Sequence, residues 1–356
     1  MLTKALSLHQ QGHLAEAAGL YRKVLAQNPK NADALHLLGV IEFQSKNPSA
    51  ALALIDRALR LVPNNPIFHS NRGNALKDLK RFDEAVTSFD RALALKPDFA
   101  EALNNRGLAL HELKRFDDAL ESYRRSLAIK PHHAKTFNNR GLALRALKRF
   151  DDALASYDRA LALEPNYADA FSNRGNVLKD LKRFEDALVN YDLALAIKPD
   201  FAEALNNRGT VLQELRRYGD AITSYQEALR TAPEYAEAHA NLGNALRELK
   251  RFDEAIASFD RALAIKPNFV DALGNRGNLM KERKNFDEAM ADFDRAMAIE
   301  PDNGFSLGAR LSCKLSICDW KGLDDEFRKL ADSIAAGRKA SEPFHVLATP
   351  LSAAMQ

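Results

Sequence analysis

Asparagine is the residue type in this chain whose spacing most clearly suggests a chemical task. A side-chain amide offers donor hydrogens and an acceptor oxygen, and a peptide backbone offers one donor and one acceptor per residue. A row of amides could therefore hold an extended polypeptide without reading its side chains. Seven asparagines, here called the asparagine row, recur every 34 residues: Asn71, Asn105, Asn139, Asn173, Asn207, Asn241 and Asn275. Four more follow members of the row by three residues: Asn74, Asn176, Asn244 and Asn278.

A second role for the same asparagines is to hydrogen-bond a neighbouring helix or water, and the two roles do not exclude each other. We number each 34-residue unit so that the asparagine row occupies repeat position 6. Positions 2, 6, 9 and 13 share one helical face, because they are separated by three or four residues. Apolar residues at positions 4, 8, 11 and 14 lie on another face. We therefore expect the asparagines to lie outside the core, along a peptide-binding groove.

The remaining residue types do not form a recognisable active site. The histidines and the two cysteines, Cys313 and Cys318, show no spacing typical of metal ligands. The recurring glycines lie in the middle of predicted helices, so a phosphate-binding loop is not expected. We predict that this chain holds no catalytic residue, no metal and no cofactor.

The period of 34 residues extends through most of the chain and predicts a stacked array of helical units. In residues 100–133, apolar residues spaced by three and four predict two amphipathic helices. A turn at Lys114 and Arg115 separates them, and Pro131 ends the second helix. Glycine at position 8, alanine at 20 and 27 and an aromatic residue at 24 are expected to be core residues that bring neighbouring helices close together.

Charge and composition limit the partners that the chain is expected to have. The net charge is +3, with 51 basic and 48 acidic residues, so we expect no nucleic-acid footprint. No apolar stretch is long enough for a membrane span, and two cysteines exclude a disulfide framework. We predict a soluble, cytoplasmic protein, with self-association through its convex face as an open alternative. Arginines at position 7 are expected to form weak, solvated surface pairs: Arg72, Arg106, Arg140, Arg174, Arg208 and Arg276.

The small residue at position 8, the alanines at 20 and 27, the aromatic at 24 and the proline at 32 resemble the tetratricopeptide repeat family. The resemblance implies an all-α fold, a right-handed α-solenoid of about nine helix pairs, whose first helices line a concave, protein-binding groove. It places a partial repeat at 1–31, eight full repeats at 32–303 and a divergent capping pair at 304–337. Trp320 then takes the position that Phe116 has in its repeat, and a tail covers 338–356.

The end of the chain resembles the segment that joins repeats to the catalytic part in the O-linked N-acetylglucosaminyltransferase and SPINDLY family. The residues that carry this resemblance are Ile317-Cys318-Asp319-Trp320, His345 and Pro350-Leu351-Ser352. The asparagine row is similar to that family's substrate-binding groove. The resemblance implies the non-catalytic, substrate-recruiting arm of a nucleotide-sugar-dependent protein glycosyltransferase, present here as a truncated chain or natural fragment. The alternative is a stand-alone scaffold or adaptor that assembles a protein complex.

Overall fold

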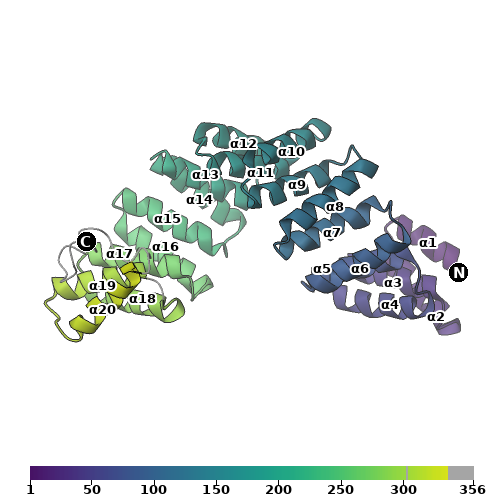
Figure 1. The fold of residues 1–356 in the computed structure, drawn as a ribbon, viewed down its shortest axis with the longest axis horizontal. Coiled ribbons are helices and arrows are strands. Elements are labelled where there is room, and N and C mark those ends of the chain that lie inside the picture. Colours follow the sequence, from purple (N-terminus) through teal and green to yellow (C-terminus); the bar gives the residue numbers. More distant parts are fainter. Residues whose placement is uncertain (302–303, 336–356) are drawn as a thin grey trace. The chain divides into compact units, whose positions relative to one another are not determined.

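The computed structural model describes residues 1–301 and 304–335, and these residues form twenty helices and no strand (Figure 1). Helices alternate as the first and second members of consecutive pairs. The first helices are α1 (Leu2–Gln10), α3 (Ala32–Gln44), α5 (Pro66–Asp78), α7 (Ala100–Glu112), α9 (Ala134–Ala146), α11 (Ala168–Asp180), α13 (Ala202–Glu214), α15 (Ala236–Glu248), α17 (Val270–Glu282) and α19 (Gly304–Ser316). The second helices are α2 (Leu14–Gln27), α4 (Pro48–Leu61), α6 (Phe82–Leu95), α8 (Phe116–Ile129), α10 (Phe150–Leu163), α12 (Phe184–Ile197), α14 (Tyr218–Thr231), α16 (Phe252–Ile265), α18 (Phe286–Ile299) and α20 (Leu323–Ala335).

Contacts divide the chain into two compact units, Met1–Leu181 and the residues from Lys182 onward. Within each unit a first helix packs against its own second helix, against the second helix of the preceding repeat, and against the next first helix. This arrangement of stacked pairs confirms the predicted all-α solenoid. Among the described residues, no helix is both long enough and apolar enough to cross a lipid bilayer.

The turn between the two helices of a repeat lies where the sequence predicts it. In the repeat of α7 and α8, Lys114 has a left-handed backbone with a φ of 58°. The amide of Lys114 donates to the carbonyl of His111 at 2.9 Å, and that of Arg115 donates to Leu110 at 2.9 Å. These bonds satisfy carbonyls at the helix end and stop the helix. The same left-handed residue recurs at Lys46, Lys80, Lys148, Lys182, Arg216, Lys250 and Lys284.

The glycine at position 8 gives the aromatic residue at position 24 its space, as predicted. A Cβ atom added at Gly141 would lie 2.6 Å from both Cε1 and Cζ of Tyr157. The Tyr157 side chain is fully buried. The glycine therefore lets α9 and α10 approach until the ring lies directly on the helix backbone. Equivalent contacts join Gly73 to Phe89, Gly209 to Tyr225, Gly243 to Phe259 and Gly277 to Phe293.

The last helix pair departs from the prediction at Trp320. This residue was expected to take the place of Phe116, which begins α8, but α20 begins only at Leu323. Gly322 has a φ of 70° and precedes the helix, so Trp320 lies in the connecting turn with 64% of its surface exposed. Leu323, Phe327 and Leu330 form the core with α19, as the apolar spacing predicted: Leu311 and the partly buried Leu307 and Leu315 contact them. Gly337, the tail 338–356 and His345 lie outside the described residues.

Candidate polypeptide-binding groove

The asparagine row connects successive first helices through side-chain hydrogen bonds. Nδ2 of Asn139 on α9 donates to Oδ1 of Asn104 on α7 at 3.1 Å, and Nδ2 of Asn173 on α11 donates to Oδ1 of Asn138 at 3.0 Å. In the second unit, Nδ2 of Asn241 on α15 donates to Oδ1 of Asn206 on α13 at 3.0 Å. Each acceptor is the position-5 residue of the preceding repeat and is buried: Asn104, Asn138 and Asn206. In each bonded pair, the asparagine at position 5 is thus the buried acceptor and the asparagine at position 6 is the half-buried donor.

His36 has the same position in the third helix as these buried asparagines. Its Nε2 lies 2.8 Å from Nδ2 of Asn71, and its ring stacks on Phe68 with a centroid distance of 4.2 Å. Burial lowers the pKa of His36 to about 4, so the ring is neutral at pH 7 and can accept the amide hydrogen. Neutral histidine and asparagine therefore serve as interchangeable acceptors at position 5.

The pattern changes where position 5 is neither asparagine nor histidine. Position 5 before Asn105 is Ser70, and Nδ2 of Asn105 donates instead to Oδ1 of Asn74, at position 9, over 2.9 Å. Position 5 before Asn275 is Ala240, and Asn275 has no hydrogen bond to any residue within 1–301 and 304–335. Most members of the row therefore hydrogen-bond a neighbouring first helix, which is the second role considered for them. Asn275 is the exception, because no residue of the described chain bonds to its amide.

The additional asparagines at position 9 do not share one environment. Asn74, Asn244 and Asn278 are half-buried. Asn176 was expected to lie outside the core, but it is only 4% exposed and has interaction partners within the protein. Asn176 is therefore a buried polar residue of α11, unlike the half-buried asparagines at the same position, and its groove role stays a prediction.

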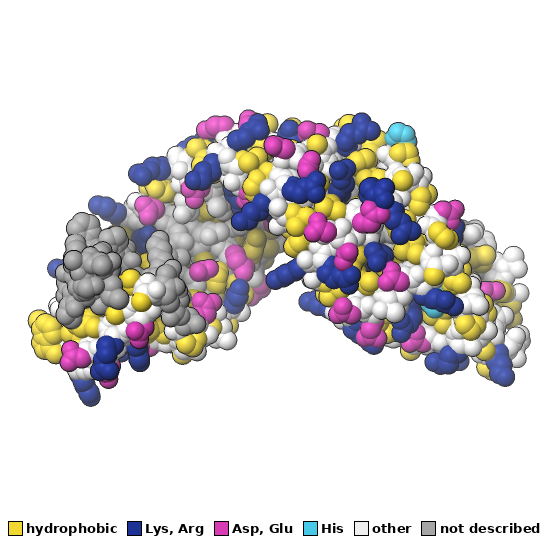
Figure 2. Space-filling view, in the orientation of Figure 1, with side chains coloured by type: hydrophobic (Ala, Val, Ile, Leu, Met, Phe, Trp, Pro, Cys, Tyr) yellow, Lys and Arg dark blue, Asp and Glu magenta, His cyan; other side chains and the backbone are white. Residues whose placement is uncertain are grey.

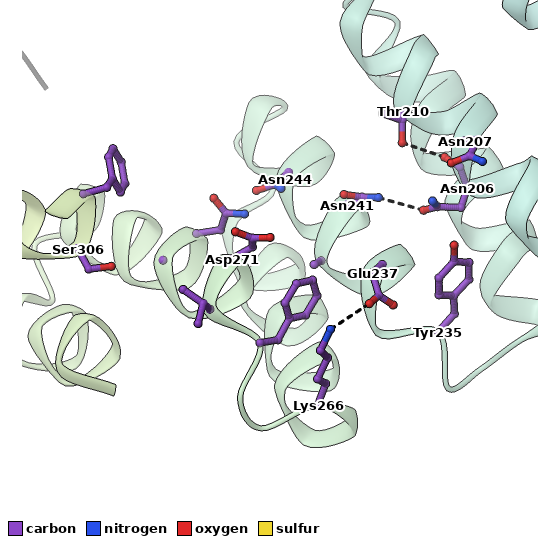
Figure 3. A pocket seen from close by; sticks show the side chains of 16 residues that line it. Asn206, Asn207, Thr210, Tyr235, Glu237, Asn241, Asn244, Lys266, Asp271 and Ser306 are labelled. Carbon is purple, nitrogen blue, oxygen red and sulfur yellow. Dashed lines mark hydrogen bonds and ion pairs between the residues drawn. The ribbon is translucent and has the colours of Figure 1, made fainter. Parts of the chain in front are cut away.

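A pocket of about 830 Å³ in the second unit brings several members of the row together (Figure 3). It is lined by side chains of the first helices α13, α15, α17 and α19 and by the turns that precede α15 and α17. The amide residues of its wall are Asn206, Asn207, Asn241, Asn244 and Asn275. An adjacent pocket of about 600 Å³ shares Asn275 and adds Asn278. Residues that sequence analysis placed on one helical face thus line both pockets of this unit.

The lining of the larger pocket includes two small residues that sequence analysis did not single out. Ala240 and Gly274 take position 5 on α15 and α17, where other repeats have asparagine, serine or histidine. A Cβ atom at Gly274 would meet no atom within 4 Å, so the space above the glycine is open. Asn275, which has no hydrogen-bond partner among the described residues, lines the same pocket. The departure from the repeat pattern at position 5 was the signal in the sequence that could have located the pocket.

Aromatic and charged side chains complete the wall of the pocket. Tyr235, Phe269 and Phe305 line it together with Glu237 and Asp271. Glu237 accepts a hydrogen bond from Nζ of Lys266 at 3.2 Å, and Lys266 lies over the Phe269 ring with Nζ 4.5 Å from its centroid. Figure 3 shows the Glu237–Lys266 contact below the hydrogen bond between Asn241 and Asn206. The arrangement offers amides, apolar rings and acids to one ligand.

The arginines at position 7 are less solvated than predicted. Arg208 donates from Nε to Asp192 on the preceding second helix at 2.7 Å, and from NH1 to Ser224 on its own second helix at 2.7 Å. Arg106 contacts Asp90 and Ser122 in the same way, at 2.6 and 2.7 Å. The arginine is only partly exposed, because it lies between two second helices. Each such arginine therefore links two consecutive repeats through its bonds to the aspartate and the serine. A solvated surface pair within one helix would not make this link.

The described part of the chain shows no cluster of side chains typical of a metal site. Within residues 1–301 and 304–335, no group of three or more histidine, cysteine, aspartate or glutamate side chains could hold a metal ion. Burial raises the pKa of the Cys313 thiol to about 11, and Cys318 is exposed and free. Acidic and basic side chains are interspersed over the face drawn in Figure 2, without a basic stripe.

Comparison with known proteins finds the same repeat throughout the array. A family model described as "Tetratricopeptide repeat" matches residues 2–66, 70–134 and 206–268, and a second model with that description matches 270–303. A model described as "TPR repeat" matches residues 141–182 and 175–216. Together these matches extend from the first helix to the residues that precede α19.

Individual relatives match over shorter stretches or with lower similarity. The inactive TPR repeat-containing thioredoxin TTL3 of Arabidopsis thaliana is 39% identical over 62 residues, which are 17% of this chain and 9% of that protein, so the chain spans a small part of this curated relative. PilF of Pseudomonas aeruginosa is 22% identical over 56% of this chain and 90% of its own, with a TM-score of 0.51, and shares the fold. The structure of YrrB, described as a TPR protein with an unusual peptide-binding site, matches 54% of this chain and 98% of its own at 26% identity and a TM-score of 0.44.

Proposed function

Because the chain belongs to the tetratricopeptide repeat family, we propose that it binds protein partners and that its asparagine row holds an extended polypeptide. The observation that carries this proposal is the pocket of about 830 Å³ in the second unit, which Asn207, Asn241, Asn244 and Asn275 line together. Pockets that bind ligands are concave, with apolar walls and a few placed polar groups. This pocket has both kinds of group.

The hydrogen bonds within the row support recognition of a peptide backbone. Nδ2 of Asn241 is fixed by Oδ1 of Asn206, so the orientation of the amide is set before a ligand arrives. Its own Oδ1 accepts no hydrogen bond from residues in the described part of the chain and is left for a backbone N–H. Asn275 contributes a donor and an acceptor that no residue of the described ranges uses. A fixed amide loses little conformational freedom on binding, which favours affinity.

The rings in the pocket wall support a ligand that also buries apolar side chains. Tyr235, Phe269 and Phe305 lie within reach of a chain that follows the amides from α13 to α19. Aromatic side chains contribute contact area at a low cost in conformational entropy. The ligand we propose is therefore an extended segment whose backbone contacts the asparagines and whose apolar side chains contact the rings.

Two finer assignments share this binding role. The arm of a protein glycosyltransferase is favoured by Ile317 and Trp320, which carry the resemblance to that family and are exposed by 41% and 64%. Large exposed apolar side chains are typical of surfaces that contact another module. The alternative is an adaptor that assembles a protein complex. A downstream reading frame with an α/β pattern of several hundred residues would favour the enzyme arm, and an immediate stop codon would favour the adaptor.

The groove role predicts a loss of affinity when the amides are removed. Changing Asn207, Asn241, Asn244 and Asn275 to alanine together should weaken binding of unfolded peptides at least ten-fold, since each lost hydrogen bond contributes about 1 kcal/mol. Fluorescence anisotropy with a labelled peptide mixture of randomised sequence measures the effect. The matched control changes Asn268 and Asn285, two exposed asparagines in turns of the same unit, to alanine. Unchanged affinity in the fourfold variant, with intact helical circular dichroism, would refute the groove role.

A further inference from the structure

One position-7 arginine of the first unit, Arg140, lacks the aspartate that pairs with its counterparts in other repeats. Wherever the residue sixteen positions before a position-7 arginine is aspartate, the two side chains form an ion pair: Arg72 with Asp56, Arg106 with Asp90, Arg174 with Asp158, Arg208 with Asp192, Arg276 with Asp260 and Arg310 with Asp294. At Arg140 that residue is Arg124. A second arginine stands where the carboxylate would be.

Neither arginine compensates for the missing carboxylate. Arg124 donates from Nε and NH2 to the two carboxylate oxygens of Glu121 on its own helix, both at 2.7 Å. Arg140 has no hydrogen bond or ion pair with any residue of the described ranges 1–301 and 304–335, although it is half-buried. A guanidinium removed from water without a counter-ion is unfavourable. Arg140 therefore offers a vacant position for an anion.

Arg140 lines a pocket of about 590 Å³ between α8, α9 and the turn that precedes α10. Its apolar wall includes Leu120, Leu127 and Phe137. Arg124 and Arg149 add positive charge, and Asp117 and Glu121 add negative charge. Arg149 forms an ion pair with Asp152, and Arg124 forms one with Glu121. Arg140 is therefore the arginine of this pocket that has no ion-pair partner in the described chain and can bind a ligand directly.

We propose that this pocket binds an acidic polypeptide segment, with a carboxylate on Arg140 and a neighbouring apolar side chain on Leu120, Leu127 and Phe137. The carboxylate takes the role that aspartate of the preceding second helix has in the other repeats. Arginine binds carboxylates through paired hydrogen bonds of favourable geometry. Asp117 and Glu121 disfavour a dianion more than a monoanion, so a carboxylate fits better than a phosphate. This site uses none of the asparagines and is independent of the proposed groove.

The test uses the full chain and labelled peptides with alternating leucine and aspartate, compared with the same peptides in which asparagine replaces aspartate. We expect the acidic peptide to bind at least ten-fold more tightly than its asparagine version. Arg140→Ala should remove this preference. Arg125→Ala, which changes an exposed arginine of α8 that does not line the pocket, should preserve it. Equal binding of the two peptides would overturn the proposal.

The decisive variant is Arg124→Asp, because it restores the residue type that the other repeats have. The new carboxylate is expected to pair with Arg140, raise the melting temperature and reduce the affinity for the acidic peptide at least ten-fold. Since this change stabilises the array, lost binding cannot be attributed to unfolding. Binding as tight as in the unmodified protein would contradict the proposal, and so would tighter binding of a phosphoserine peptide than of the aspartate peptide.

Discussion

Replacing Gly141 with valine is expected to lower the free energy of unfolding by about 3 kcal/mol. The first added carbon alone would lie 2.6 Å from two ring atoms of Tyr157, a distance at which the ring or the helix must move. Tyr157 is fully buried, so the ring has no free space to enter. Valine is favoured over glycine in a helix by a few tenths of a kcal/mol, which is far too little to offset the overlap. Urea unfolding monitored by circular dichroism measures the change.

The control for this variant is Gly19→Val on α2. A Cβ atom at Gly19 would meet no atom within 4 Å, and we expect a change within about 0.5 kcal/mol. We choose valine rather than alanine because the first repeat already has an alanine, Ala5, at position 8, together with the buried Tyr21 at position 24. Alanine can therefore be accommodated at this position, whereas the larger valine tests the available space more strongly. Equal stability of the two valine variants would show that position 8 does not set the approach of the helices.

Lowering the pH from 7 to 5 is expected to remove about 2 kcal/mol of stability through His36 alone. Its pKa is lowered from 6.5 to about 4, first by burial and against the opposing charge of Asp33; His9 lowers it slightly further. The unfolded chain therefore binds more protons than the folded chain between these two values, and stability falls as the pH drops through that window. Well above pH 6.5 both states are neutral at this residue, so the contribution is constant there. Well below pH 4 both states are charged.

The matched control is His36→Asn, because asparagine already serves as the acceptor at this position in Asn104, Asn138 and Asn206. This variant should keep the hydrogen bond from Asn71 and lose the steep dependence between pH 4 and 6.5. The pKa values of His69, His111, His133 and His239 are also lowered, first by burial, but these residues are present in both proteins and cancel in the difference. Parallel stability curves for the two proteins would contradict the assignment to His36.

The sequence predicted the helix pairs closely, because their signals are local. The apolar spacing, the turn at Lys114 and Arg115 and the proline at position 32 each act within a few residues of the boundary that they define. Trp320 was misplaced because the repeat frame was extended through Gly322, whose φ of 70° interrupts the helix. Gly322 in the sequence indicated a possible interruption of the helix, but the prediction gave more weight to the 34-residue period.

The candidate site was predicted only in part, since its bonds join residues about 35 positions apart. The helical face of the asparagine row followed from spacing, whereas the acceptor role of position 5 depends on how one first helix lies against the next. The same limit explains Asn176, whose burial no local pattern indicates. The bridging role of the arginines also required the approach of two second helices, although aspartate sixteen residues before most of them was a usable signal.

The most direct test of the central claim compares peptides of identical sequence with and without methyl groups on their backbone nitrogens. If the asparagines that line the pocket of the second unit bind a peptide backbone, methylation should weaken binding at least ten-fold, because each methyl group removes a backbone donor. Exchanging the side chains of the unmethylated peptide for others of similar apolar character should change the affinity by less than about three-fold. Equal affinity of the methylated and unmethylated peptides would contradict backbone recognition by the asparagine row.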